Sequence, residues 1–263
     1  MKRIYHAFQF LRFIGNPNER SERKVCPMHS GFTLFGAIHV LILCAVPALA
    51  GALGFAHRRF PAARNFIRLG FAAILLVDNA VYYTWQIRHH DLRFPDHMPF
   101  ELCDASMALT ILSLFLLRPL LFDLAYYWAL AGASMALLTP NLREPFPSFG
   151  TVQFFMSHGL TVAGVLYLVW SGQARPRPWS VARAMIGVNV FAFLVGPFDY
   201  LYKTNYFYLR SKPVNPSLLD FLGPWPIYIA GTEAVALVLF LMLYLPVRRT
   251  RKVKAAANEA VPA

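Results

Sequence analysis

Long apolar stretches constrain this chain more than any other feature of its sequence. Seven stretches of about 20 residues carry few charges, and a helix needs about that length to cross roughly 30 Å of hydrocarbon. Backbone groups in lipid need internal partners, and barrel strands would alternate apolar and polar residues, which these stretches do not. The sequence therefore predicts an all-α polytopic membrane bundle of seven transmembrane helices, at residues 31–56, 65–86, 98–117, 119–138, 150–171, 180–202 and 225–245.

Composition agrees with a membrane location and argues against a soluble or disordered protein. Apolar residues make up 57% of the chain and charged residues 14%, whereas a soluble domain has about 25% charged residues. The net charge of +12 would suit a nucleic-acid binder, but the basic residues fall in short clusters between apolar stretches, as in membrane-protein loops. We therefore expect no nucleic-acid partner. Three scattered cysteines, Cys26, Cys44 and Cys103, predict neither a disulfide framework nor a zinc site.

The chain divides into a membrane domain and two basic tails. Residues 1–30 form the first tail, in which residues 5–14 either lie on the membrane as a short amphipathic helix or remain disordered. The membrane domain covers residues 31–246, and residues 247–263 are expected to be a disordered basic tail. Only Arg118 separates the third and fourth stretches, so they form either a tight hairpin, whose second arm begins at Pro119, or one broken helix.

Basic residues favour one orientation in the cell membrane. Seven spans put the two termini on opposite sides, with 12 Lys and Arg on the N-terminal side and 13 on the other. When Lys2, Arg3 and Arg12 are left out for their distance from the first span, the balance becomes 9 against 13. The positive-inside rule then predicts an external N-terminus and a cytoplasmic C-terminus.

Polar residues inside the spans gather in the half near the N-terminal face. At ~1.5 Å per residue, Cys103 lies about 7 Å deep and Asp78, His158 and Glu233 about 12 Å deep. Asp199, Glu101 and Asp104 fall in the same half, whereas Asp123 and Arg183 lie near the opposite face. Because charged groups in hydrocarbon usually face a protected cavity, this convergence predicts a water-accessible pocket. The alternatives are that the helix-end carboxylates reach water and that His158 is a packing histidine bonded to a carbonyl.

Cys103 and His158 are the candidate catalytic pair. A cysteine becomes a strong nucleophile when a neighbouring base removes its proton, which is the minimum for acyl transfer through a thioester. The dipole of a helix that begins just before Cys103 would help the thiolate, and ionised Glu101 and Asp104 beside it would oppose it. Glu233 or Asp78 could orient the imidazole. The separation of 55 residues in sequence does not indicate whether the pair is in contact.

Residues 203–228, between the last two spans, supply the candidate substrate-binding groups. The segment is dense in Tyr, Pro and basic residues. Arg210 and Lys212 could meet a lipid phosphate, and Asn205 or Tyr206 could donate to a carbonyl oxygen. An aromatic belt at the membrane interface is the structural alternative.

No cofactor or metal is expected. The last span lacks a Lys for a retinal Schiff base, and phosphate loops and Rossmann glycine motifs do not occur. The histidines at residues 89, 90 and 97 are expected to be solvated in a polar loop rather than to bind a metal ion.

Four motifs together resemble a known family: PFELCD around Cys103, FPSFGTVQFFMSHG around His158, NYFYLRSKP from Asn205, and PSLLDFLGPWPIY ending at Tyr228. In this order they resemble the YwaF-like integral membrane proteins, over nearly the whole chain. Animal relatives look like phospholipid acyltransferases that use a Cys and a His, and by position those roles would fall on Cys103 and His158. Bacterial members often have His where this chain has Glu101, so a role of that His does not transfer.

These patterns give two hypotheses of different classes. In the first, Cys103 attacks a lipid ester, His158 transfers the proton, and a membrane lipid is the substrate. In the second, the protein is a proton-coupled transporter or lipid-binding protein without a covalent step, and Asp78 and Glu233 carry protons. The acyl donor, the acceptor and the oligomeric state stay open.

Overall fold

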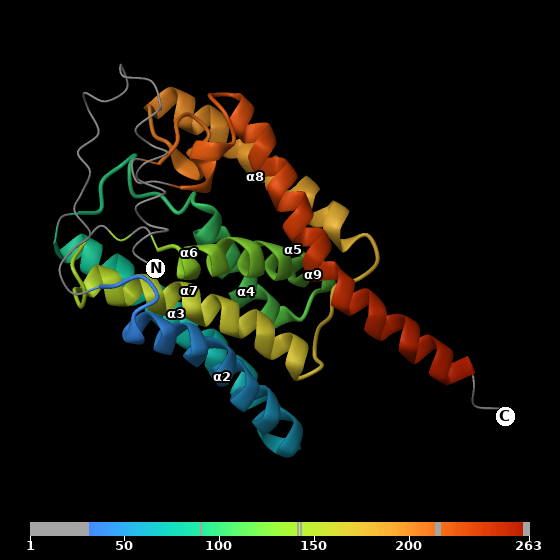
Figure 1. The fold of residues 1–263 in the computed structure, drawn as a ribbon. Coiled ribbons are helices and arrows are strands. Elements are labelled where there is room, and N and C mark those ends of the chain that lie inside the picture. Colours follow the sequence, from blue (N-terminus) through green and yellow to red (C-terminus); the bar gives the residue numbers. More distant parts are fainter. Residues whose placement is uncertain (1–31, 90, 141, 143, 214–216, 260–263) are drawn as a thin grey trace.

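Helices build the whole membrane domain of this computed structural model (Figure 1), which describes residues 32–89, 91–140, 142, 144–213 and 217–259. No β-strand occurs in these residues. The predicted surface helix at residues 5–14 lies outside them. The α-helices are α2 (Ala37–Arg59), α3 (Arg64–Arg88), α4 (Leu102–Leu116), α5 (Pro119–Tyr127), α6 (Ser134–Leu138), α7 (Phe149–Trp170), α8 (Ser180–Tyr202) and α9 (Ile227–Glu259). Short turns of other helix types are η3 (Pro61–Ala63), η4 (Trp128–Ala133), η5 (Tyr206–Tyr208) and η6 (Leu218–Phe221).

Six helices are long and apolar enough to cross a membrane, which confirms an all-α multi-pass membrane protein. The third predicted span, residues 98–117, is the exception. α4 has 15 residues, or about 22 Å, and is shorter than the hydrocarbon layer. It begins four residues later than predicted from the apolar run, because Pro99 precedes it and Glu101 caps its first turn.

The α4–α5 turn is the predicted hairpin and not a broken helix. α4 ends at Leu116, Leu117 takes a left-handed conformation, and Pro119 opens α5. The predicted span 119–138 keeps its outer bounds but is interrupted by the six-residue π-helix η4. Its Gly132 lies against α4, because a Cβ built there would come 3.4 Å from Leu102 Cδ2.

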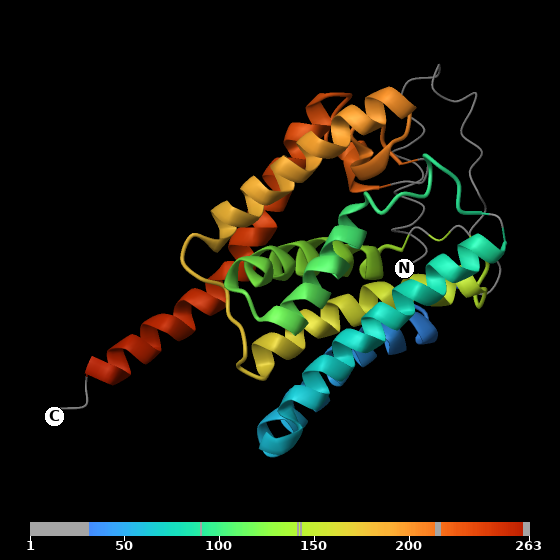
Figure 2. The same cartoon turned by 180° about the vertical axis from the view of Figure 1, so that it is seen from behind.

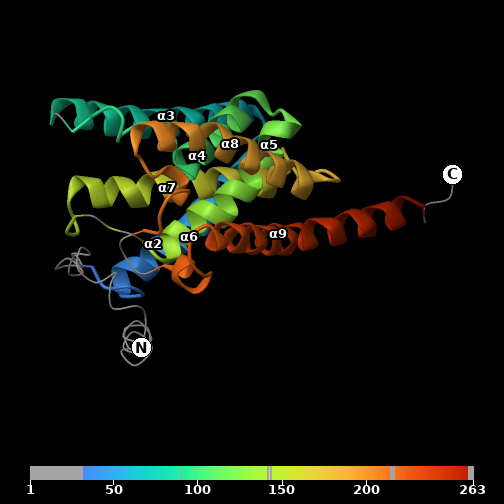
Figure 3. The same cartoon turned by 90° about the horizontal axis from the view of Figure 1, so that it is seen from above.

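α7 and the α5–η4–α6 segment form the centre of the bundle. Half of the most apolar window of each is buried, against 11 to 22% for the other long helices. α7 packs against α2, α3, α4 and η4, whereas α8 packs on α5 and α9 packs on α8 and η4 (Figures 1 and 3). The end of α9 projects beyond the other helices in all three views, and the helix continues to Glu259 (Figure 3).

Gly164 lets α7 and α4 approach closely, so Gly164→Ala is expected to lower the free energy of unfolding by about 1–3 kcal/mol. A Cβ at Gly164 would lie 2.9 Å from Thr110 Cγ2. Thr110 cannot turn away freely, because its hydroxyl donates to the Ser106 carbonyl at 2.8 Å. Reversible unfolding in mixed SDS micelles measures the loss.

Gly70→Ala is the matched control for Gly164→Ala. Gly70 also lies inside a helix, but no atom lies within 4 Å of a Cβ built there. Alanine in a helix interior is favoured over glycine, so this variant should keep or raise the stability. Equal losses in the two variants would contradict the close-contact explanation.

Candidate functional site

Cys103 lies in the first turn of α4, a turn that two carboxylates cap. It is the second residue of the helix, partly buried, with a free thiol. Glu101 and Asp104 form a capping box, in which each side chain accepts from the other residue's backbone N–H; the Glu101 N–H to Asp104 Oδ2 distance is 3.2 Å. Glu101 Oε2 also accepts from the Phe207 N–H at 3.2 Å. Glu101 and Asp104, two of the four carboxylates predicted to lie near the catalytic pair, thus hold the start of the helix that carries Cys103.

His158 lies on α7 with one ring nitrogen engaged. Its Nδ1 lies 2.7 Å from the Phe154 carbonyl oxygen. A carbonyl oxygen can only accept, so Nδ1 carries the proton, and Nε2 of a neutral ring keeps its lone pair. The contact is the carbonyl bond expected of a packing histidine, yet it also sets the tautomer that a general base acting through Nε2 requires.

Cys103 and His158 lie on neighbouring helices but do not share a hydrogen bond in the described structure. Residues 103, 107, 110 and 114 lie on one face of α4, and Thr110 and Leu114 on that face contact Gly164 of α7. The first turn of α4 therefore points its cysteine toward the α7 side. From that contact the ribbons of α4 and α7 diverge toward the start of α4 (Figure 2). The pair is therefore placed on neighbouring helices, with Cys103 at the start of α4 and His158 within α7.

Asp78, predicted to orient the imidazole, has a different neighbour. It lies on α3, and its nearby polar side chain is that of Gln153 on α7. Its Oδ2 is buried and has no partner among the described residues. Gln153 was missed in the sequence analysis because a glutamine in an apolar run carries no charge signal; it lies five residues before His158 on the same helix.

Glu233, the other predicted orienting group, lies on α9 and accepts from Asn189 Nδ2 of α8 at 3.0 Å. A shallow hollow of about 400 Å³ adjoins this bond on α8, lined by Met185, Ile186, Asn189, Val190 and Phe193. This hollow includes neither Cys103 nor His158. The carboxylates that share one depth in the sequence therefore divide among different helix pairs.

The predicted substrate-binding residues hold the segment around η5 together. Asn205 Oδ1 accepts from the backbone N–H groups of Arg210 and Ser211, both at 3.0 Å. Arg210 Nη1 donates to the Thr204 carbonyl at 3.1 Å, near the end of α8, and Lys212 Nζ lies 5.6 Å from the centre of the Tyr228 ring. These contacts stabilise the segment, and the exposed Arg210 keeps further donors on its guanidinium.

Tyr206 connects this segment to the chain that leads into α4. Its buried hydroxyl donates to the Pro95 carbonyl and accepts from the Met98 N–H, each at 2.7 Å. Burial raises the pKa of the Tyr206 phenol, so the hydroxyl remains a donor at neutral pH. Together with the Glu101–Phe207 bond, Tyr206 positions the first turn of α4, and hence Cys103.

Asp199 anchors the same segment to the end of α8. It is fully buried and does not reach water. Oδ1 accepts from Thr204 Oγ1 at 2.7 Å and from the Tyr206 N–H at 3.0 Å. Oδ2 is buried without a partner among the described residues. The sequence places Asp199 at a helix end but does not show that the chain folds back over it.

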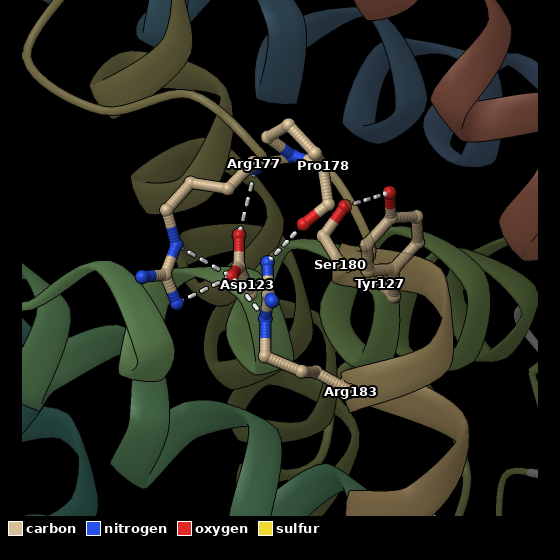
Figure 4. A network of polar contacts seen from close by, with 6 residues as sticks. All are labelled: Asp123, Tyr127, Arg177, Pro178, Ser180 and Arg183. Carbon is tan, nitrogen blue, oxygen red and sulfur yellow. Dashed lines mark hydrogen bonds and ion pairs between the residues drawn. The ribbon is translucent and has the colours of Figure 1, made fainter.

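A second buried carboxylate, Asp123, stabilises the end of the bundle that lies away from Cys103 (Figure 4). Oδ1 accepts from the Arg177 N–H at 3.0 Å. Oδ2 accepts from Arg177 Nη2 at 2.8 Å and from Arg183 Nε at 2.9 Å. Tyr127 and Ser180 bond beside it at 2.8 Å. The network ties the α7–α8 loop to α5, and it is far along the bundle from the Cys103 turn.

Comparisons with known proteins agree with a membrane protein of one family. The sequence profile of the TMEM164 family matches residues 28–244. A protein of Treponema pallidum (strain Nichols), described as an uncharacterized protein, is 26% identical over 220 residues, which cover 82% of this chain and 90% of that protein. No solved structure matches the chain. The resemblance to YwaF-like proteins stays a prediction, since these matches do not carry that name.

Proposed function

Since the chain belongs to the TMEM164 family of membrane proteins, we propose that it is a phospholipid acyltransferase or transacylase that acts through Cys103 and His158. One observation carries the proposal. Cys103 lies in the capped first turn of α4, on the face directed to α7, and His158 of α7 has its Nδ1 proton bound and Nε2 available. Thioester chemistry needs a thiol and an available imidazole nitrogen that can come within hydrogen-bond reach, and these two helices carry both groups.

The reaction transfers an acyl group in two steps. His158 Nε2 takes the Cys103 proton, the thiolate forms a C–S bond with the ester carbonyl carbon, and the C–O bond breaks as the imidazolium returns the proton to the leaving oxygen. A second lipid hydroxyl then attacks the thioester and releases the thiol. Because the two side chains do not share a hydrogen bond in the described structure, the first step requires the thiol and the imidazole to come within hydrogen-bond reach of each other.

The proposed location is the cell membrane with a cytoplasmic C-terminus. The loops, the tail and the adjoining helix ends on that side hold 13 Lys and Arg, with Arg68 and Arg183 counted among them. Cys103 then lies in the outer half of the bilayer, away from acyl-CoA, so the acyl donor is another phospholipid.

A tagged lipid tests the covalent step. The full chain in phosphatidylcholine nanodiscs is given phosphatidylcholine with an alkyne-tagged acyl chain, and the label that neutral hydroxylamine removes is measured on the protein. We expect labelling to be lost in Cys103→Ala, to fall strongly in His158→Gln, and to persist in the control Cys44→Ala, which removes an exposed thiol on α2. Undiminished labelling of Cys103→Ala, or the absence of label in the unaltered chain, would overturn the proposal.

A proton-coupled transporter or lipid-binding protein is the second candidate. Asp78 favours it, because a buried carboxylate oxygen without a partner inside a span can bind and release a proton. In that case the unaltered chain takes no label, and Asp78→Asn, rather than Cys103→Ala, abolishes lipid or proton movement in vesicles.

A further inference from the structure

Three loops meet at the end of the bundle opposite Cys103. The end of α2 lies beside the end of α7, because a Cβ at Gly54 would come 3.5 Å from the Ser171 nitrogen. The start of α3 lies beside the end of α4, since Arg68 Nη1 donates to the Leu114 and Phe115 carbonyls. The Asp123 network holds the α7–α8 loop beside the start of α5. The α2–α3, α4–α5 and α7–α8 connections thus share one surface.

This surface is strongly positive. The three connections and the helix turns beside them carry eight arginines: Arg58, Arg59, Arg64, Arg68, Arg118, Arg175, Arg177 and Arg183. Among the described residues, Asp123 is the one carboxylate near these arginines. It is fully buried and already bound by two guanidiniums. Five exposed arginines, at positions 58, 59, 64, 118 and 175, form what we call the arginine end. Among the described side chains, no exposed carboxylate balances their charge there.

Exposed aromatic rings place the arginine end at a membrane interface. Phe60, Phe66 and Trp179 are 54%, 81% and 80% exposed, and they flank the same connections. Trp, with an apolar ring and an N–H donor, favours the headgroup level of a bilayer, and the exposed Phe60 and Phe66 rings add apolar surface at the same connections. The Arg59 guanidinium lies 5.6 Å from the centre of the Phe60 ring, so the charge is held at the level of this ring. At the headgroup level of the bilayer, exposed arginines contact lipid headgroups.

We propose that the arginine end is a binding site for anionic phospholipid headgroups. A guanidinium binds a phosphate through paired N–H donors, and Arg holds such oxyanions with better geometry than Lys. Zwitterionic lipids bring their own cation, which the uncompensated arginines repel, whereas a phosphatidylglycerol-type headgroup has net negative charge. The site is independent of the proposed acyl transfer, because it lies at the other end of the bundle from Cys103.

Lipid competition on the purified full chain tests the site. The protein in non-ionic detergent receives equimolar dioleoyl-phosphatidylglycerol and dioleoyl-phosphatidylcholine, and native mass spectrometry gives the ratio of bound lipids. We expect the unaltered chain to prefer phosphatidylglycerol, and Arg58→Gln/Arg59→Gln to reduce that preference about tenfold, since each basic residue near an anionic surface contributes to the attraction. Raised salt should weaken the preference of the unaltered chain, because exposed charges are screened.

The control removes two positive charges from the opposite end. Arg88→Gln/Lys203→Gln alters two exposed cations near the Cys103 side and should keep the preference. Gel filtration and helix content show that both double variants fold. Equal binding of the two lipids by the unaltered chain, or an equal loss in the control, would overturn the site. So would displacement of the bound lipid by polyglutamate at equal charge, which would instead identify the arginine end as a surface for an acidic protein.

Discussion

Replacing Asp123 with alanine is expected to lower the free energy of unfolding by about 3 kcal/mol. The carboxylate is fully buried and accepts from one backbone N–H and two guanidiniums. Loss of one partner of a buried ion pair costs about 3–5 kcal/mol when the remaining charge stays buried. The side chains of Arg177 and Arg183 are 39% and 29% exposed, so they can turn toward water, which places the loss near the lower limit.

Asp123→Asn separates the charge from the backbone contact. Its amide oxygen can still accept from the Arg177 N–H, but it does not attract the guanidiniums as a carboxylate does, so a loss of about 2 kcal/mol is expected. Asp220→Ala is the control, because this exposed carboxylate only caps η6 through the Ser217 N–H at 3.0 Å. SDS unfolding measures all three. A loss below about 1 kcal/mol for Asp123→Ala would show that the network contributes little to stability.

The sequence predicted the helix bounds correctly where a run of about 20 apolar residues forms one membrane-spanning segment. α8 has the same bounds as the predicted span at residues 180–202, and the α5–η4–α6 segment keeps residues 119–138. Averages over an apolar run do not show local interruptions. The six-residue π-helix η4 lies inside such a run, and the late start of α4 coincides with the cap at Glu101. Neither changes the average hydropathy of the run.

The partners of the polar residues could not be predicted, because depth in a membrane specifies a level and not a neighbour. Asp78 and Glu233 share a depth with His158 in the sequence, but Glu233 accepts from Asn189 and Asp78 lies near Gln153 instead. Asp123 and Arg177 are 54 residues apart, and only the folded loop brings them together. Helix periodicity does place Cys103 on the α7-facing side of α4, so the orientation of the candidate nucleophile is easier to infer than the group that would activate it.

Replacing Asp199 with alanine is expected to lower the free energy of unfolding by about 3 kcal/mol, with the effect concentrated at the Cys103 end. The variant removes the acceptor for the Thr204 hydroxyl and the Tyr206 N–H, two buried donors that then have no carboxylate partner. Hydrogen bonds to a charged group contribute about 1.5–3 kcal/mol each, and part of this is recovered if water enters. Reversible SDS unfolding gives the global change.

Limited trypsin digestion localises the effect of Asp199→Ala. Lys203 and Arg210 lie in the segment that Asp199 anchors, so cleavage there should accelerate in Asp199→Ala while cleavage at Arg58 and Arg59 does not change. Asp199→Asn is the matched variant, because its amide oxygen can still accept both bonds that Oδ1 makes, and it should remain close to the unaltered chain. If Asp199→Asn were as labile as Asp199→Ala, the negative charge and not the acceptor would hold the segment. If neither variant made the segment more sensitive to trypsin, Tyr206 would be anchored mainly through Pro95 and Met98.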